Sequence, residues 1–423
     1  MALRFLIEYV SACPPSGSTL ISYELFDRLI ALCAEIIVLG SISDRIRYKI
    51  DDTSVATRSG FLSIGQDSYN GAVDNFVPNY LGELIARSIK HFEEPWKRVD
   101  FQETENTDDD SHNDLFHRAF LEEFGFGYYD YQKTCGQMLI IGLEQDEPCK
   151  FMPRERLIAR ISAEADIPID TVRHIVDSIT LAKRDDYLKP PLGYEKWDVY
   201  PWKVNRNLSF LRKPLILAER VEEQGIFWGN RHLFNSMEFL FDHCYSGKLR
   251  ARTKTMKWFI SDVRNRDGKA FNDEVFDAFA KLPGIALRKR IDHFCGRQMS
   301  DAKGVLGDID ILAVNHSKSH VLVIECKNLN AAISPDEYQN ELKSLFVDDD
   351  AESESAKLLR RARWIEDNIE LVLTELKMSL RTEWQYQALI VTSEELFTPY
   401  LRRTPVLTIS AKRLLEEFIP SWI

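Results

Sequence analysis

The fold of this chain is decided by two stretches of its 423 residues, Gly307-Asp308-Ile309-Asp310-Ile311-Leu312 and Val321-Leu322-Val323-Ile324-Glu325-Cys326-Lys327. Both are rich in aliphatic and β-branched residues, which predicts two β-strands. The link between them is short and polar, as in a hairpin. Because side chains alternate between the faces of a strand, Asp308 and Asp310 share one face. Glu325 and Lys327 likewise share a face of the second strand, so pairing would gather two or three carboxylates and a lysine.

Carboxylates gathered between apolar strands indicate a bound metal ion. A buried carboxylate is costly without a partner, and carboxylate oxygens are the ligands that Mg²⁺ prefers, with waters and a phosphate completing the shell. A lysine beside such an ion can orient a water or offset charge on a phosphate. The alternative is an amphipathic hairpin with a solvated polar face and an ordinary Glu–Lys pair. In either case the apolar side chains are expected on the opposite face, namely Ile309, Ile311, Leu322 and Ile324.

Asp310 followed by Glu325-Cys326-Lys327 resembles the PD-(D/E)xK signature of restriction-endonuclease-like nucleases. Ile309 stands where the name of the signature has a proline, which many members lack. The resemblance concerns the range 246–423 and says nothing about the chain before it. It implies a nuclease core of the order αβββαβ, in which Asp310 and Glu325 bind Mg²⁺ or Mn²⁺ and Lys327 assists catalysis.

The resemblance also implies accessory positions. In such nucleases a helix before the first strand often carries an additional glutamate at the metal site, and Glu274 is the candidate here, with Asp273 as second choice. An acid that serves only the helix dipole is the competing interpretation. Gln339 lies on an expected later helix and is an accessory candidate, although a surface position is favoured. Asp308 is the accessory acid beside Asp310.

The residues around the signature predict a mixed α/β domain. Ser334-Pro335 has the pattern of a helix start, with serine as N-cap and proline at the first position. The other expected elements are strands at 285–291, 386–391 and 406–409 and helices at 357–378 and 411–418. The fold class is therefore α/β in this domain and α+β for the whole chain.

The first 245 residues are expected to be mainly helical. We divide them into a helical region, 1–110, and a mixed helical region, 111–245. The second holds a helix-turn-helix pattern with helices at 154–165 and 170–180, followed by strands at 208–217 and 226–228 that could form a wing. A structural helix pair is favoured over a DNA-reading one, because the second helix offers Arg173, His174 and Asp177, which is not a basic set.

The charge of −12 is unevenly distributed. Acidic residues concentrate at 103–114 and 348–354, which we expect to be exposed loops. A basic segment near the start of the range 246–423 could bind nucleic acid, since it also contains Trp258 and Phe259, which can stack on bases. The alternative is a solvated helix face. The candidate nucleic-acid-binding residues of this segment are Lys248, Arg250, Arg252, Lys254 and Lys257.

The composition indicates an intracellular protein. There is no run of about 18 apolar residues, so no membrane span is expected, and the N-terminus lacks a full signal-peptide pattern. The seven cysteines form no CxxC pair, as for free thiols in a reducing compartment, and we expect a cytoplasmic location. The abrupt start on an apparent helix leaves open that the chain is a piece of a longer polypeptide.

These observations predict a metal-dependent nuclease that hydrolyses phosphodiester bonds. DNA is the expected substrate and RNA stays open. Phage defence is the expected setting, with mobile-element or DNA processing as alternatives; this setting is an analogy. The second hypothesis is a catalytically inert nucleic-acid-binding or complex-assembly subunit with a nuclease-like fold. A protein partner is expected at the N-terminal region, and homo-oligomerisation is left open.

Overall fold

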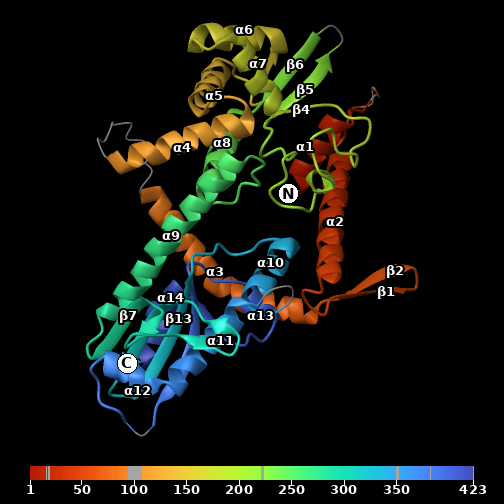
Figure 1. Ribbon diagram of the computed structural model, residues 1–423. Coiled ribbons are helices and arrows are strands. Elements are labelled where there is room, and N and C mark those ends of the chain that lie inside the picture. Colours follow the sequence, from red (N-terminus) through yellow and green to blue (C-terminus); the bar gives the residue numbers. More distant parts are fainter. Residues whose placement is uncertain are drawn as a thin grey trace. The chain divides into compact units, whose positions relative to one another are not determined.

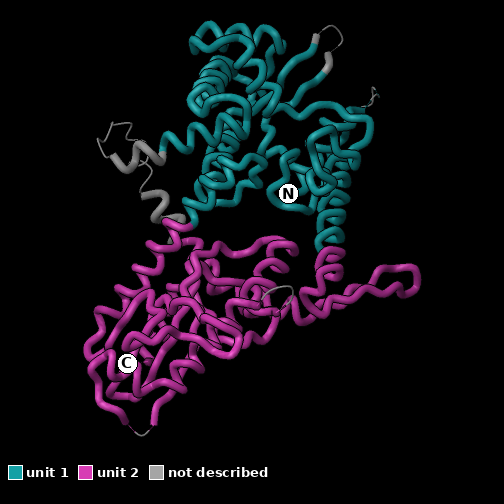
Figure 2. Tube along the Cα trace, in the orientation of Figure 1, with its two compact units in different colours: residues 1–41, 103–264 teal, residues 42–102, 265–423 magenta. Residues whose placement is uncertain are grey.

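The structure is a computed structural model that describes residues 1–15, 17, 20–93, 107–220, 223–348, 352–381 and 383–422 (Figure 1). The chain forms two compact units, one of residues 1–41 and 103–264 and one of residues 42–102 and 265–423 (Figure 2). Each unit therefore combines two separate parts of the chain, whereas the three ranges expected from the sequence are contiguous. The divisions fall inside α2 (Tyr23–Tyr48) and α9 (Lys254–Ala280).

The first unit is largely helical. Besides the starts of α2 and α9, it contains α1 (Ala2–Ala12), α4 (Thr107–Phe124), α5 (Tyr128–Leu143), α6 (Arg154–Ala165), α7 (Ile169–Ser178), the short η1 (Lys196–Val199) and α8 (Asn230–Tyr245). Its sheet has the order β3-β6-β5-β4, formed by β3 (Lys150–Pro153), β4 (Thr180–Leu181), β5 (Leu215–Arg220) and β6 (Glu223–Trp228).

The predicted helix-turn-helix is confirmed in α6 and α7. Asp166 ends α6 in the left-handed conformation, with a φ of 52°, and Pro168 precedes α7. The apolar positions of both helices face one large core. The predicted strand pair follows as β5 and β6, although β5 begins at Leu215 rather than at residue 208. On α7, Arg173 pairs with Asp170 and Asp177 pairs with Arg154, so the charges of this helix pair are largely balanced.

The second unit is built on a five-stranded sheet of order β15-β14-β13-β12-β7. The strands are β7 (Ile285–Ile291), β12 (Ile309–Asn315), β13 (His320–Lys327), β14 (Gln385–Thr392) and β15 (Leu407–Ser410). β7, β12 and β13 are antiparallel neighbours, while β14 and β15 run parallel to β13. The predicted hairpin is confirmed, with Asn315 opposite His320.

Helices connect and cover these strands. α9 precedes β7, and α10 (Pro335–Leu345), α11 (Glu354–Asp367) and α12 (Ile369–Glu375) lie between β13 and β14. The mixed α/β class is confirmed, as is the order of one helix, three strands, helices and a strand. The remaining elements of the unit are β1 (Ser54–Arg58), β2 (Phe61–Gly65), α3 (Asp67–Glu93), β8 (His293–Phe294), β9 (Arg297–Gln298), β10 (Ser300–Asp301), β11 (Gly304–Val305), α13 (Thr398–Leu401), α14 (Ala411–Arg413), η2 (Leu414–Phe418) and α15 (Ile419–Trp422).

The central sheet is covered on both faces. On one face, Ile311, Leu322 and Ile324 pack with residues of α9 and of the C-terminal helices. On the other, Leu312 and Val323 pack with residues of α11. Ile309 belongs to the α11 side, so the expectation that it shares a face with Ile311 is wrong. Both faces are apolar because helices cover both, and this explains why the two strands read as nearly continuous hydrophobic runs.

Two sequence expectations are corrected here. The helix expected at 357–378 is two helices, because Asn368 interrupts it and its side chain donates to the carbonyl of Trp364 at 2.8 Å. The acidic stretch 103–114, expected to be a loop, is helical from Thr107, and residues 103–106 lie outside the described part. Of the second acidic stretch, residues 349–351 also lie outside it, and α11 starts at Glu354.

Within the described residues, no helix has both the length and the apolar character needed to cross a bilayer.

Candidate active site

The ends of β12 and β13 bring the predicted acids together. The antiparallel register pairs Ile311 with Ile324, so Asp310, which precedes Ile311, and Glu325, which follows Ile324, are neighbours across the pair. The backbone N–H of Cys326 donates to Oδ2 of Asp310 at 2.8 Å. Glu325 is buried and Asp310 half-buried. As expected, the side chain of Cys326 packs into the core on the other face.

Lys327 joins the same group. Its Nζ lies 2.8 Å from Oε1 of Glu325 and 2.7 Å from Oε2 of Glu354, the first residue of α11. Lys357, one turn along that helix, contacts Oε1 of Glu354 at 2.7 Å. The lysine is therefore held between two carboxylates, one from its own strand and one from the covering helix.

Arg361 completes the cluster from α11. Its guanidinium lies 2.7 Å from Oε2 of Glu325, and its Nε donates to the carbonyl of Leu306 at 2.9 Å. Leu306 and Gly307 lead into β12, and Gly307 has a φ of +74°, which only glycine adopts readily. A Cβ at this glycine would lie 3.2 Å from the Arg361 guanidinium, so the turn and the arginine fit closely.

Sequence reasoning missed Glu354 and Arg361. A signal for Arg361 was present, since it falls inside the apolar stripe of α11 formed by Leu358, Ala362 and Ile365. A charged side chain at such a position needs a buried partner. The identity of the acidic partner of Arg361 depends on how α11 packs on the sheet, and this packing cannot be predicted from the spacing of residues in the sequence.

The electrostatics of the cluster depend on burial. Burial raises the pKa of both Asp310 and Glu325, against the opposing effects of the Cys326 N–H on the first and of Lys327 and Arg361 on the second. Burial disfavours the charge of Lys327, but the carboxylates of Glu325 and Glu354 outweigh it and raise the lysine pKa. Burial also opposes ionisation of Glu354, yet Lys327 and Lys357 lower its pKa to about 2. Lys327 is therefore a charged donor at neutral pH.

The residues present fit a hydrated Mg²⁺ or Mn²⁺ better than a fully protein-bound ion. Among the residues that the structure describes, no group of three or more His, Cys, Asp or Glu side chains is placed to hold a metal. Mg²⁺ commonly takes only one or two carboxylates and completes its shell with waters and phosphate oxygens. Glu325 already accepts from Lys327 and Arg361, but a carboxylate has about four acceptor sites, so capacity remains.

Asp308 precedes β12 and is exposed, and its charge adds to the raised pKa of Asp310. The remaining candidates of this domain lie apart from that cluster. Asp273 pairs with Lys289 of β7 at 3.0 Å. Glu274 is exposed on α9, whose apolar residues pack on the sheet face opposite α11. Gln339 is half-buried on α10, beside a separate apolar cluster. Within the described residues, no hydrogen bond or ion pair links Glu274 or Gln339 to Asp310 or Glu325.

The basic candidates lie in the first unit and are exposed: Lys248, Arg250, Arg252, Lys254 and Lys257. Two of them already have acidic partners, since Arg250 lies 2.8 Å from Glu195 and Arg252 lies 3.4 Å from Glu123. Lys254 and Lys257 stand on the first turn of α9 beside Trp258, which is 58% exposed. Their role in nucleic-acid binding stays a prediction.

Comparison with known proteins identifies one family. The family described as "Anti-phage protein Upx-like" matches residues 1–375, which spans Asp310, Glu325, Lys327 and Arg361 and stops before β14. No curated protein and no solved structure matches the chain.

Proposed function

This chain belongs to the Upx-like family of anti-phage proteins and serves in phage defence, and from this premise we propose that it acts as a metal-dependent nuclease. The observation that carries the proposal is the meeting of Asp310, Glu325 and Lys327 at the end of two paired strands. Phage nucleic acid is the target that fits both phosphodiester hydrolysis and a role in phage defence. DNA is the proposed substrate, and the cytoplasm the proposed place of action.

Asp310 and Glu325 are the residues that would hold Mg²⁺ or Mn²⁺. The bound ion would polarise the scissile phosphate and lower the pKa of a coordinated water. Lys327 carries its proton at neutral pH, so it donates hydrogen bonds that orient a water and offset charge on the phosphate. Arg361 is a positioning residue, because it fixes the carboxylate of Glu325 from the side of α11. Glu274, Gln339 and Asp308 remain accessory proposals.

The first experiment is a cleavage assay on the full chain. Supercoiled plasmid, linear duplex DNA, single-stranded DNA and RNA are each incubated with Mg²⁺, Mn²⁺ or EDTA. Cutting is expected with the metals and not with EDTA. Asp310→Asn, Glu325→Gln and Lys327→Met should each lose at least about a hundredfold in rate, which is a typical effect of removing one charge-stabilising group. Lys318→Met, at an exposed position of the β12–β13 link, is the matched control and should cut normally.

The same assay identifies the substrate class. Cutting of DNA alone indicates a deoxyribonuclease, and cutting of RNA alone indicates a ribonuclease. Metal-dependent cutting that persists in two of the three site variants would contradict the assignment. The folded state of each variant is checked by circular dichroism, so that loss of rate is not confused with unfolding.

A second candidate is a catalytically inert assembly subunit, and one observation favours it. Glu325 has a cation against each of its oxygens, and Lys327 is held by two carboxylates, so the cluster is neutralised internally. Such a network could serve only to join α11 to the sheet. A plaque assay distinguishes the two once circular dichroism shows that Lys327→Met is folded. The folded variant should lose protection if cleavage is the mechanism and keep it if the cluster serves only the fold.

A further inference from the structure

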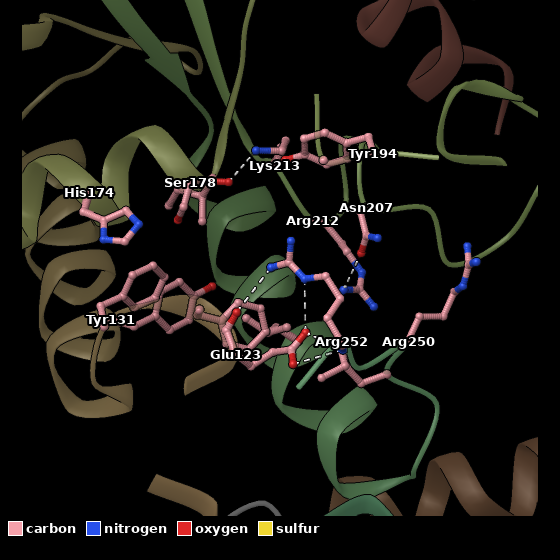
Figure 3. A pocket seen from close by; sticks show the side chains of 16 residues that line it. Glu123, Tyr131, His174, Ser178, Tyr194, Asn207, Arg212, Lys213, Arg250 and Arg252 are labelled. Atoms are coloured by element: carbon pink, nitrogen blue, oxygen red, sulfur yellow. Dashed lines mark hydrogen bonds and ion pairs between the residues drawn. The ribbon is translucent and has the colours of Figure 1, made fainter. Parts of the chain in front are cut away.

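The first unit contains a cavity of about 210 Å³ that the nuclease proposal does not use. It lies where the end of α4, α5, α7 and the start of α9 meet the segment around Tyr194 to Lys213. Figure 3 shows Arg212, Arg252 and Glu123 grouped in it, with Lys213 reaching Ser178. All of these residues belong to one compact unit, so the site does not depend on how the units are placed.

Two cations of the cavity have only neutral partners. Arg212 donates to Oδ1 of Asn205 at 2.6 Å and to Oδ1 of Asn207 at 3.1 Å, while its buried Nε has no hydrogen-bond partner. Lys213 is buried and donates to the carbonyl of Ser178 at 2.5 Å. In the described part of the chain, no carboxylate forms an ion pair with either. Charges taken out of water without a counter-ion are costly, so a ligand that supplies negative charge would stabilise this arrangement.

The acid in the cavity is already engaged. The carboxylate of Glu123 accepts from the backbone N–H of Arg252 at 3.0 Å and of Thr253 at 2.8 Å, and thereby caps the start of α9. It also lies 3.4 Å from Nε of Arg252. Glu123 thus compensates Arg252 and the helix end. Burial lowers the pKa of Arg212 to about 10, as expected for a guanidinium whose charge has little compensation.

Aromatic side chains form the rest of the wall. Phe126 and Tyr131 are buried and Tyr194 is half-buried. His174 of α7 meets Phe126 edge to face, with 5.3 Å between ring centroids, and lines the same cavity. A flat, partly apolar group can lie against such rings, whereas an oxyanion would be drawn to Arg212 and Lys213.

We propose that this cavity binds a small organic phosphate of the nucleoside monophosphate class. Arg212 and Lys213 receive the phosphate, and the aromatic wall receives the remainder of the ligand. The volume is below the range of about 300–1,000 Å³ usual for drug-sized ligands, which argues against a dinucleotide or a longer chain. The inference does not rest on the nuclease activity, since it concerns binding in the other unit.

Calorimetry on the full chain tests the proposal, with adenosine monophosphate, inorganic phosphate and adenosine as ligands at about 0.15 M salt. We expect adenosine monophosphate to bind at least about tenfold more tightly than adenosine, a difference of about 1.4 kcal/mol. Arg212→Gln and Lys213→Met should each weaken its binding by about tenfold or more. Arg160→Gln removes an arginine of α6 that does not line the cavity, and should change nothing.

Three results would overturn the proposal. One is the absence of binding by any phosphate compound. Another is equal binding of adenosine and adenosine monophosphate. The third is unchanged affinity for adenosine monophosphate in both cavity variants. If Arg212→Gln fails to fold by circular dichroism, Lys213→Met decides, and because no cleavage is measured, failure of the nuclease proposal leaves this test intact.

Discussion

The guanidinium of Arg361 lies 2.7 Å from the carboxylate of Glu325, and both side chains are buried. This ion pair joins α11 to β13 at the point where the candidate catalytic residues gather. The pair therefore has two consequences, one for the stability of the second unit and one for the position of a carboxylate that we assign to metal binding.

Arg361→Ala should lower the free energy of unfolding by about 3 kcal/mol, because it leaves Glu325 buried with one cation fewer. The change is measured by urea denaturation. Arg363→Ala, at an exposed position of the same helix, is the control and should shift stability by less than about 0.5 kcal/mol. Equal effects of the two substitutions would show that the buried pair contributes nothing.

Glu354 should make stability sensitive to acid. Its folded pKa of about 2 is below the ordinary value of 4.5, so its contribution is present above pH 4.5 and is lost as pH falls toward 2. Glu354→Gln should therefore destabilise the protein at pH 7, by on the order of 2 kcal/mol, and by about half of that or less at pH 3. Urea midpoints across this range measure the difference. Glu366→Gln, exposed on the same helix, should show a constant offset, and a constant offset for Glu354→Gln would contradict the prediction.

Glu341 should have the opposite effect on the pH dependence of stability. Burial raises its folded pKa to about 7, even though it accepts a hydrogen bond from Thr398. As pH falls from 8 to about 4.5, the folded state takes up this proton before the unfolded chain does, so stability should rise, by on the order of 2 kcal/mol. Glu341→Gln should lack this rise and be the more stable protein at pH 8. Melting temperatures at pH 8 and pH 5 test it, with exposed Glu370→Gln as the control; a rise that persists in Glu341→Gln would refute it.

Lys254 and Lys257 should contribute to nucleic-acid affinity by neutralising phosphates. Replacing both by glutamine should weaken binding at low salt to the same extent for every DNA sequence. The slope of log affinity against log salt concentration should become shallower by about 0.9 for each phosphate that is no longer neutralised. Fluorescence anisotropy with labelled duplex DNA at several salt concentrations measures this slope. Lys318→Gln, on the β12–β13 link, is the control, and an unchanged slope in the double variant would remove these lysines from the interface.

Local pattern predicted the candidate catalytic hairpin well. The alternation of side chains along a strand is a property of the backbone, so the grouping of Asp310 with Glu325 and Lys327 follows once the two strands pair. The helix-turn-helix at α6 and α7 was predictable for a similar reason, since its apolar spacing and the turn at Pro168 are local. The face assigned to Ile309 was wrong, because this first residue of β12 packs on the α11 side although Ile311 packs on the other.

The sequence by itself determined the mixed α/β class, the paired strands and the three residues on which the proposed chemistry rests, because each follows from periodicity within a few residues. Only the tertiary structure decided that α11 brings Glu354 and Arg361 onto that site, and that Arg212 and Lys213 meet an aromatic wall in a cavity of the other unit. These arrangements join residues distant in the chain, and their geometry depends on how whole helices pack, which no local spacing records.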